Sequence, residues 1–370
     1  MTSRKRITAA LNKREVDRLP FSPLLDQYFV TGLPQQGYHF DLLQAMDYIG
    51  CDIIMRHTPS YKTIYKGFTV NEKAEGDVIY TIYDTPYGSL KSSVQYTKGT
   101  FFIKEHLIKD CEDLKVAQFI AENTFFEPAF EQFYEVDKTI GERGIASPDG
   151  SITPIMEFIQ FYAGLENATY LLMDYPDEVE SLFDAMHRRN KRVYSILADL
   201  KCEAVFAYED TSSTLLNMDW LERYAIPAVN DYAGILRGSG KVYITHMCGK
   251  LYAFRNMISR FKSDGIDSVC PPTTGDICLW DARKHFPEKV LIGGLEPPAL
   301  ARMSKEETLK YVIDFINNMP DKRGVILSTG DATPYGTPIE NLRAITDLLN
   351  MLGEESLKTG IGYGLIEKIK

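Results

Sequence analysis

The sequence contains no run of about 18 apolar residues, which is the length that a helix needs to cross a membrane. It also lacks a basic excess, since 41 Lys and Arg stand against 51 Asp and Glu and give a net charge of −10. Nucleic acid is therefore not an expected partner. The opening residues are polar and charged, without the apolar core of a signal peptide. These absences predict a cytoplasmic protein that acts on neither membranes nor nucleic acids.

Cysteine is also scarce, with six residues in a chain of 370. This number is too small for a disulfide scaffold, and without an export signal we expect the thiols to be reduced. The chain shows no tandem repeat and no low-complexity segment. Its length and ordinary composition are compatible with a single α/β barrel domain spanning residues 1–370.

Short apolar segments alternate with stretches of helical periodicity, most regularly after residue 110. A succession of eight strand and helix units is typical of a (β/α)8 TIM barrel, which is the fold that we predict. The eight predicted strands are Leu19–Asp26, Cys51–Met55, Gly144–Pro148, Ala204–Tyr208, Val242–Thr245, Ile266–Val269, Val290–Ile292 and Val325–Leu327.

Residues from about 60 to 108 differ from the rest of the chain. They are rich in Thr, Tyr and Val, and turn sequences occur at Glu75-Gly76 and at Pro86-Tyr87-Gly88. This pattern is typical of antiparallel hairpins. We therefore predict a β-hairpin insertion after the second barrel strand.

A pair of potential metal ligands follows the fifth predicted strand. In a TIM barrel the active site lies at the C-terminal ends of the strands. The strand at Val242–Thr245 runs into His246 and Cys248, and residues two apart on an extended strand point to the same side. Imidazole and thiolate both bind zinc, so the pair predicts a metal site, with Glu209 and Asp331 as the best candidates for further ligands. The alternative is a hydrogen-bonded histidine beside a packed cysteine.

Carboxylates follow three of the predicted strands and are candidates for catalysis. Asp26 ends the first strand, and the acid pair Glu209 and Asp210 follows the fourth. The alternative role of this pair is helix capping, although Asn217 can cap the helix that follows. Asp331, after the last strand, has the alternative role of a turn residue.

Aromatic residues make up 12% of the chain and cluster near strand ends. Residues 27–29, 101–106 and 158–162 follow strand one, the insertion and strand three, respectively. They could line a pocket for a flat, apolar substrate, or they could pack in the core.

Several segments resemble the uroporphyrinogen decarboxylase superfamily. The similar segments, in the order of the family, are DRLPFSP, EDTSSTLLNMDWLERYAIPAVNDY, THMCGK, VLIGGLEPP and GVILSTGDATPYGTPIENLRAI. The resemblance extends over nearly the whole chain and implies a (β/α)8 barrel. The decarboxylase itself has an arginine-rich stretch after strand one, where this chain reads LLDQYFVTGLPQQGYH. The segment THMCGK instead resembles the branch of zinc-dependent methyltransferases that work with corrinoid proteins.

This resemblance implies a bound Zn²⁺ and a partner protein that contains a corrinoid. Asp331 stands where the thiol-directed members of the branch have a cysteine. A ligand set with fewer thiolates is harder and better suited to polarising oxygen, so we expect demethylation of a small O-methyl compound. The identity of the methyl donor or acceptor, the direction of transfer and the oligomeric state, including a homodimer, stay open.

Three alternatives to this function remain at the level of the sequence. The first is transfer of methyl from a methylcorrinoid to a thiol. The second is a cofactor-free decarboxylase that uses Asp26 and Tyr208 on a carboxylated substrate. The third is a corrinoid-handling partner that has the fold without the chemistry.

Overall fold

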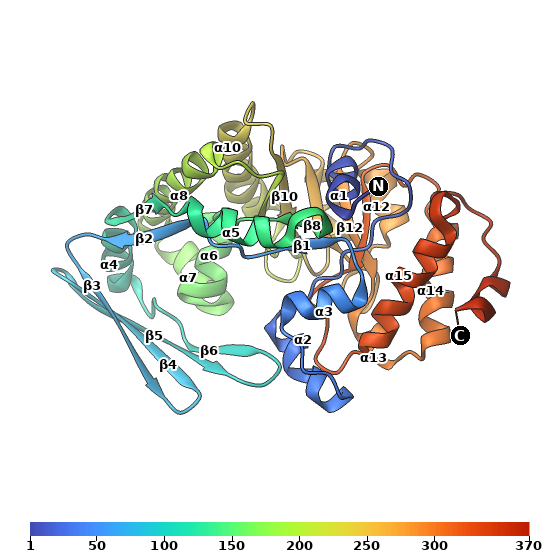
Figure 1. Cartoon of the computed structure of the whole chain (residues 1–370). Coiled ribbons are helices and arrows are strands. Elements are labelled where there is room, and N and C mark those ends of the chain that lie inside the picture. The colour runs from blue at the N-terminus through green and yellow to red at the C-terminus, as the bar shows by residue number, and fades with distance from the viewer. Residues whose placement is uncertain (370) are drawn as a thin grey trace.

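The computed structural model describes residues 1–369, and parallel strands form its centre (Figure 1). Two parallel sheets are present, one with the strand order β13-β12-β11-β10-β9 and one that pairs β1 with β8. The parallel strands are β1 (Ile53–Met55), β8 (Gly144–Ala146), β9 (Ala204–Tyr208), β10 (Val242–His246), β11 (Gly265–Val269), β12 (Val290–Leu295) and β13 (Val325–Thr329).

Single-residue bridges join these two sheets into a closed ring. Phe21 pairs in parallel with Leu327 of β13, and its carbonyl accepts a hydrogen bond from Asp52, next to β1. On the other side, Asp149 pairs in parallel with Phe206 of β9. The segment around Phe21 is thus the eighth strand position, and the predicted (β/α)8 barrel is confirmed.

The first barrel segment is shorter than the strand predicted over residues 19–26. Its regular pairing is limited to Phe21, which is flanked by Pro20 and Pro23. Proline has no N–H to donate, so it interrupts the ladder of a strand on both sides of this residue. The prediction was right about the position of the segment and wrong about its length.

An apolar cluster fills the interior of the barrel, and the first helix closes its N-terminal end. Ile7, Ala10 and Leu11 of this helix pack against the inward-facing residues of the strands, among them Ile244 and Ile292. The C-terminal ends of the strands therefore form the open mouth.

The helices pack around the outside of the ring (Figure 1). Ser304 and Glu307 form the capping box that the sequence predicts at the start of α14. The α-helices are α1 (Ser3–Leu11), α2 (Gln27–Gly32), α3 (Leu42–Ile49), α4 (Cys111–Glu122), α5 (Phe130–Ile140), α6 (Pro154–Glu157), α7 (Leu165–Asp174), α8 (Pro176–Asp199), α9 (Met218–Trp220), α10 (Ile226–Leu236), α11 (Arg255–Ile258), α12 (Leu279–His285), α13 (Pro297–Arg302), α14 (Lys305–Asn318) and α15 (Ile339–Leu352). None of the helices within residues 1–369 combines the length and the apolar character that a membrane span requires.

An antiparallel sheet projects from one side of the barrel (Figure 1). It packs on α4 through β4 and β5. Its strands are β3 (Thr69–Glu75), β4 (Val78–Thr85), β5 (Gly88–Tyr96) and β6 (Phe101–Glu105).

All four of these strands lie within the stretch where the sequence predicts hairpins. The preceding strand β2 (Tyr61–Tyr65) pairs instead with β7 (Thr124–Pro128), beyond α4. Local turn signals cannot indicate a pairing that spans an intervening sheet and helix, because only adjacent strands are connected by turns.

Candidate metal centre

Polar side chains form the last layer of the barrel interior before the mouth. Ile244 belongs to the interior cluster, and His246 shares its face of β10 because side chains alternate along a strand. His246 lies in register with Tyr208 of β9 and Asp267 of β11. Arg56, directly after β1, joins this layer through an ion pair with Asp267. The layer that faces the mouth is therefore charged, in contrast to the apolar layers below it.

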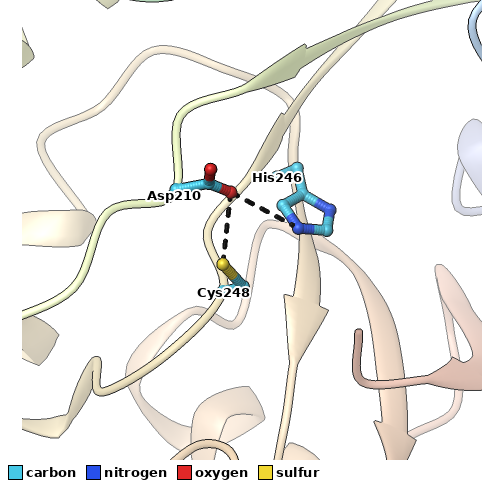
Figure 2. Close-up of side chains that lie close together, drawn as sticks. All are labelled: Asp210, His246 and Cys248. Carbon is cyan, nitrogen blue, oxygen red and sulfur yellow. Dashed lines mark hydrogen bonds and ion pairs between the residues drawn. The ribbon is translucent and has the colours of Figure 1, made fainter. Parts of the chain in front are cut away.

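Three different ligand atoms meet at this layer (Figure 2). Cys248 Sγ lies 3.2 Å from Asp210 Oδ1, and His246 Nε2 lies 3.7 Å from the same oxygen. All three atoms lie within 4.8 Å of one another, and within residues 1–369 no other group of three or more such side chains does so. Ligand atoms placed tetrahedrally at about 2.0–2.3 Å from one zinc ion lie about 3.3–3.8 Å apart, close to the separations of 3.2 and 3.7 Å found here.

The backbone after β9 decides which acid faces this group. Asp210 has a φ of 44°, in the left-handed region where Asp and Asn occur more often than most residues. Its N–H donates to the carbonyl of His246 at 3.0 Å, which holds the turn against β10. The Asp210 carboxylate therefore faces His246 and Cys248.

A buried carboxylate orients the histidine. Asp267 Oδ2 lies 2.7 Å from His246 Nδ1, and the same carboxylate forms a two-point ion pair with Arg56. Burial opposes ionisation of Asp267, but Arg56 keeps the pKa of its carboxyl below the ordinary value. With Nδ1 engaged, His246 presents Nε2 to Asp210 and Cys248. Metal-binding histidines are held in this manner by a carboxylate behind the ring.

The surroundings of this group hold protons on its ligand atoms. Burial raises the pKa of the Cys248 thiol well above its ordinary value, and Asp210 and Asp331 raise it further. Burial also raises the pKa of Asp210, against the lowering effect of His246. Burial alone would lower the pKa of His246, but the hydrogen bond and charge of Asp267 outweigh it and the pKa is raised. A divalent cation would favour the ionised thiolate and carboxylate over their protonated forms, and the nitrogen, sulfur and oxygen donors fit such an ion.

The Glu209 carboxylate contacts Thr153, whereas the Asp210 carboxylate contacts Cys248. The Glu209 carboxylate accepts hydrogen bonds from the backbone N–H of Thr153 at 3.1 Å and from the Thr153 hydroxyl at 2.8 Å. Burial raises the pKa of Glu209 to about 8, although Thr153 partly opposes the rise. In this position Glu209 holds the loop after β8 and lies outside the group of three ligand atoms.

The two remaining predicted acids also lie outside that group. Asp331 Oδ1 accepts from the N–H of Ala332 at 2.7 Å, and Asp331 acts on Cys248 through its charge. Asp26 caps α2, since its Oδ1 accepts from the N–H of Phe29 at 3.0 Å.

Asp267 and Arg56 were not predicted from the sequence. One signal was present, because Asp267 is a charged residue inside the predicted strand Ile266–Val269. A buried charge requires a partner. The identity of that partner depends on strand register, which the sequence does not specify.

A cavity of about 470 Å³ opens next to the ligand group. The barrel mouth contributes Asp149, Tyr208 and Asp210 to its lining, and Tyr65 of β2 and Tyr83 of β4 face it from the projecting part of the chain. This size is typical of small-molecule pockets. Asp210 thus connects the ligand group to a space for a small molecule.

The fold and this layer define a (β/α)8 barrel with a candidate metal centre at its mouth. The family described as uroporphyrinogen decarboxylase (URO-D) matches residues 108–351, which is more than half of the chain. The chain belongs to this family. The matched residues include Asp210, His246 and Cys248, whereas the sheet β3–β6 lies outside them.

Solved structures share this fold at low sequence identity. A methyltransferase from Methanosarcina mazei superposes with a TM-score of 0.64 and 13% identity, covering 95% of this chain and 99% of its own. A B12-independent methionine synthase from Shewanella sp. in complex with selenomethionine has a TM-score of 0.48 and 11% identity, covering 92% of this chain and 99% of its own. No curated protein matches the sequence.

Proposed function

We propose that the protein is a zinc-dependent methyltransferase that moves a methyl group from a small O-methyl compound to the cobalt of a separate corrinoid protein. The convergence of His246, Cys248 and Asp210 at the barrel mouth is the observation on which the proposal depends. The THMCGK segment supports the corrinoid branch of the family, and the Methanosarcina methyltransferase supports methyl transfer on this fold.

His246 Nε2, Cys248 Sγ and one Asp210 oxygen would hold the zinc ion. Asp267 and Arg56 would keep the imidazole in the tautomer that leaves Nε2 unprotonated. Asp331 is the candidate for a fourth ligand, because its charge already acts on Cys248. When bound, the ion would act as a Lewis acid toward an oxygen of the methyl donor, whose leaving group is otherwise poor.

The composition of the ligand group favours an oxygen donor over a thiol acceptor. One thiolate, one imidazole and one carboxylate make a harder set than two thiolates. The side chains beside the group would position the donor, since Asp210 belongs both to the ligand group and to the lining of the cavity. Thiol methylation remains the second proposal for this site.

A cofactor-free decarboxylase would need cationic side chains that are free to bind substrate carboxylates. Arg56 is paired with Asp267, and Arg189, the basic residue in the cavity lining, is paired with Glu157. Both arginines are already in ion pairs within the protein, so neither is free to bind a substrate carboxylate. These pairings favour the methyltransferase over the decarboxylase.

The proposal is tested with the zinc-loaded full chain, a reduced corrinoid protein and a panel of O-methyl donors, with methylation of cobalt followed by absorbance. We expect transfer from at least one donor, and Cys248→Ala and His246→Ala to lose at least about 100-fold in rate because the ion is no longer held. Undiminished transfer in Cys248→Ala, or in the presence of a strong chelator, would contradict the proposal. Methylation of a thiol by methylcorrinoid, without the reverse reaction on O-methyl donors, would support the second proposal instead.

A further inference from the structure

Six of the eighteen residues that line the cavity beside Asp210 are aromatic. They come from the barrel, from the strands around the insertion and from the π-helical turn Phe158–Ala163. The six rings are Tyr65, Tyr83, Phe126, Phe161, Tyr162 and Tyr208. Aromatic faces have a negative quadrupole and attract organic cations.

The charged residues in the lining are unequal in number. Asp149, Glu157 and Asp210 are acidic, and Arg189 is the one basic residue in the lining of this cavity. The Arg189 guanidinium is already engaged, since it pairs with Glu157 and donates to the Tyr162 hydroxyl at 3.1 Å.

Further hydrogen bonds complete the surroundings of this arginine. Its Nε and Nη2 donate to Asn190 Oδ1 at 3.0 and 2.8 Å. The guanidinium is therefore a structural element of the wall rather than an anion-binding group. An anionic ligand would meet three carboxylates in this cavity and no free cationic side chain in its lining.

Asp149 is a partly exposed carboxylate of the cavity lining that does not belong to the group of three ligand atoms. About a third of its side chain is exposed, and its Oδ2 lies 2.8 Å from Nδ1 of His57. Its other oxygen, Oδ1, is buried and has no hydrogen-bond partner within residues 1–369. Asp149 therefore has one oxygen engaged by His57 and one without a partner.

The rings and Asp149 are adjacent. The His57 ring stacks on Tyr208 at 4.4 Å between centroids, and Tyr208 lines the cavity together with Asp149. A cation in this space would contact aromatic faces and a carboxylate at the same time, as in known sites for ammonium groups.

We propose that this cavity binds a methyl donor with an ammonium group, which lies among the aromatic rings with Asp149 as its countercharge, while the oxygen-bearing end of the donor reaches Asp210. This assignment of a substrate class rests on the proposed function for the role of the oxygen end. The cation site itself requires only the cavity. Tyr65 and Tyr83 lie outside the residues matched to the family, whereas Asp149 and the other four rings lie within them.

Binding is measured calorimetrically on the zinc-loaded full chain with three probes of similar shape: para-methoxybenzylammonium, para-methoxybenzyl alcohol and para-methoxybenzoate. We expect the ammonium probe to bind at least about tenfold more tightly than the alcohol, and the benzoate to bind most weakly. Asp149→Asn should remove most of the preference for the ammonium probe. Asp84→Asn is the matched control and should retain it, because Asp84 follows Tyr83 on β4 and points to the opposite face.

Equal binding of the ammonium and alcohol probes, tightest binding of the benzoate, or no binding of the ammonium probe would overturn the inference. An unchanged preference in folded Asp149→Asn would also overturn it. If Asp149→Asn does not fold, Tyr83→Leu provides the second variant, and loss of the ammonium preference there supports the site while an unchanged preference overturns it. Because binding is measured without turnover, a cation preference in a protein that transfers no methyl group would refute the proposed function and leave the cation site standing.

Discussion

Glu209 and Asp210 are adjacent acids with different surroundings. The left-handed turn at Asp210 directs its carboxylate to His246 and Cys248, while Glu209 is held by Thr153. We infer that Asp210 is a ligand and that Glu209 supports the loop after β8. The φ of 44° at Asp210 and the hydrogen bond from its N–H to the carbonyl of His246 accompany this distinction.

At the scale of single residues, the hydrogen bond between Asp267 and His246 Nδ1 gives a testable prediction. Asp267→Asn should weaken zinc binding about 10–100-fold, because a neutral amide holds the imidazole less firmly in the required tautomer. Zinc affinity is measured by competition with a chromophoric chelator on protein whose fold is verified by circular dichroism. Glu209→Gln is the matched control, since it also removes a buried carboxylate, and it should leave zinc affinity unchanged. Equal zinc affinity in wild type and Asp267→Asn would contradict the role of this carboxylate.

The sequence contained only part of this arrangement. The spacing of His246 and Cys248 is sufficient to predict that both face one space, because side chains alternate along a strand. The preference for Asp210 over Glu209 could not be predicted, since both follow the same strand. The partnership of Asp267 with Arg56 depends on contacts across the barrel, between residues 211 positions apart.

At the scale of helices and strands, a buried cluster of Asp52, Arg6 and Arg18 stabilises the N-terminal end of the barrel. Asp52, directly before β1, is fully buried and accepts hydrogen bonds from Arg6 of α1 at 2.6 Å and from Arg18 at 2.9 Å. It also accepts from the N–H of Phe21 at 3.0 Å. One carboxylate thus connects α1, which closes the N-terminal end of the barrel, with the short first barrel segment and β1.

Removal of this carboxylate gives the prediction for this scale. Asp52→Ala should lower the free energy of unfolding by about 3–5 kcal/mol, because two buried guanidinium groups lose their shared partner. Denaturant titration measures the change. Asp321→Ala, which breaks the exposed pair with Arg323, should cost at most about 1 kcal/mol. Similar losses in the two variants would show that the buried cluster does not fasten the barrel.

Element prediction from the sequence succeeded where local signals are strong. Apolar runs marked the barrel strands, and the cap at Ser304 marked the start of α14. The predicted length of the first strand was wrong because Pro20 and Pro23 interrupt its apolar residues. A prediction from hydrophobicity alone ignores the missing N–H groups of these prolines.

At the scale of the whole molecule, two parts of the chain meet at the candidate site. The barrel, which contains the residues matched to the family, provides the ligand group. The strands between residues 61 and 105, most of them in the projecting sheet, provide two of the aromatic rings over the cavity. The sequence predicted both parts but not how they meet. The strand β2 pairs with β7, which follows the inserted sheet and α4 in the sequence, and local patterns do not indicate so distant a pairing.

The central claim is that His246, Cys248 and Asp210 hold one zinc ion, and X-ray absorption at the zinc edge of the zinc-loaded full chain tests it most directly. We predict one sulfur ligand at about 2.3 Å together with nitrogen and oxygen ligands at about 2.0–2.2 Å, and loss of the sulfur signal in Cys248→Ala. A wild-type protein that retains no zinc, or the same sulfur signal in wild type and Cys248→Ala, would contradict the claim.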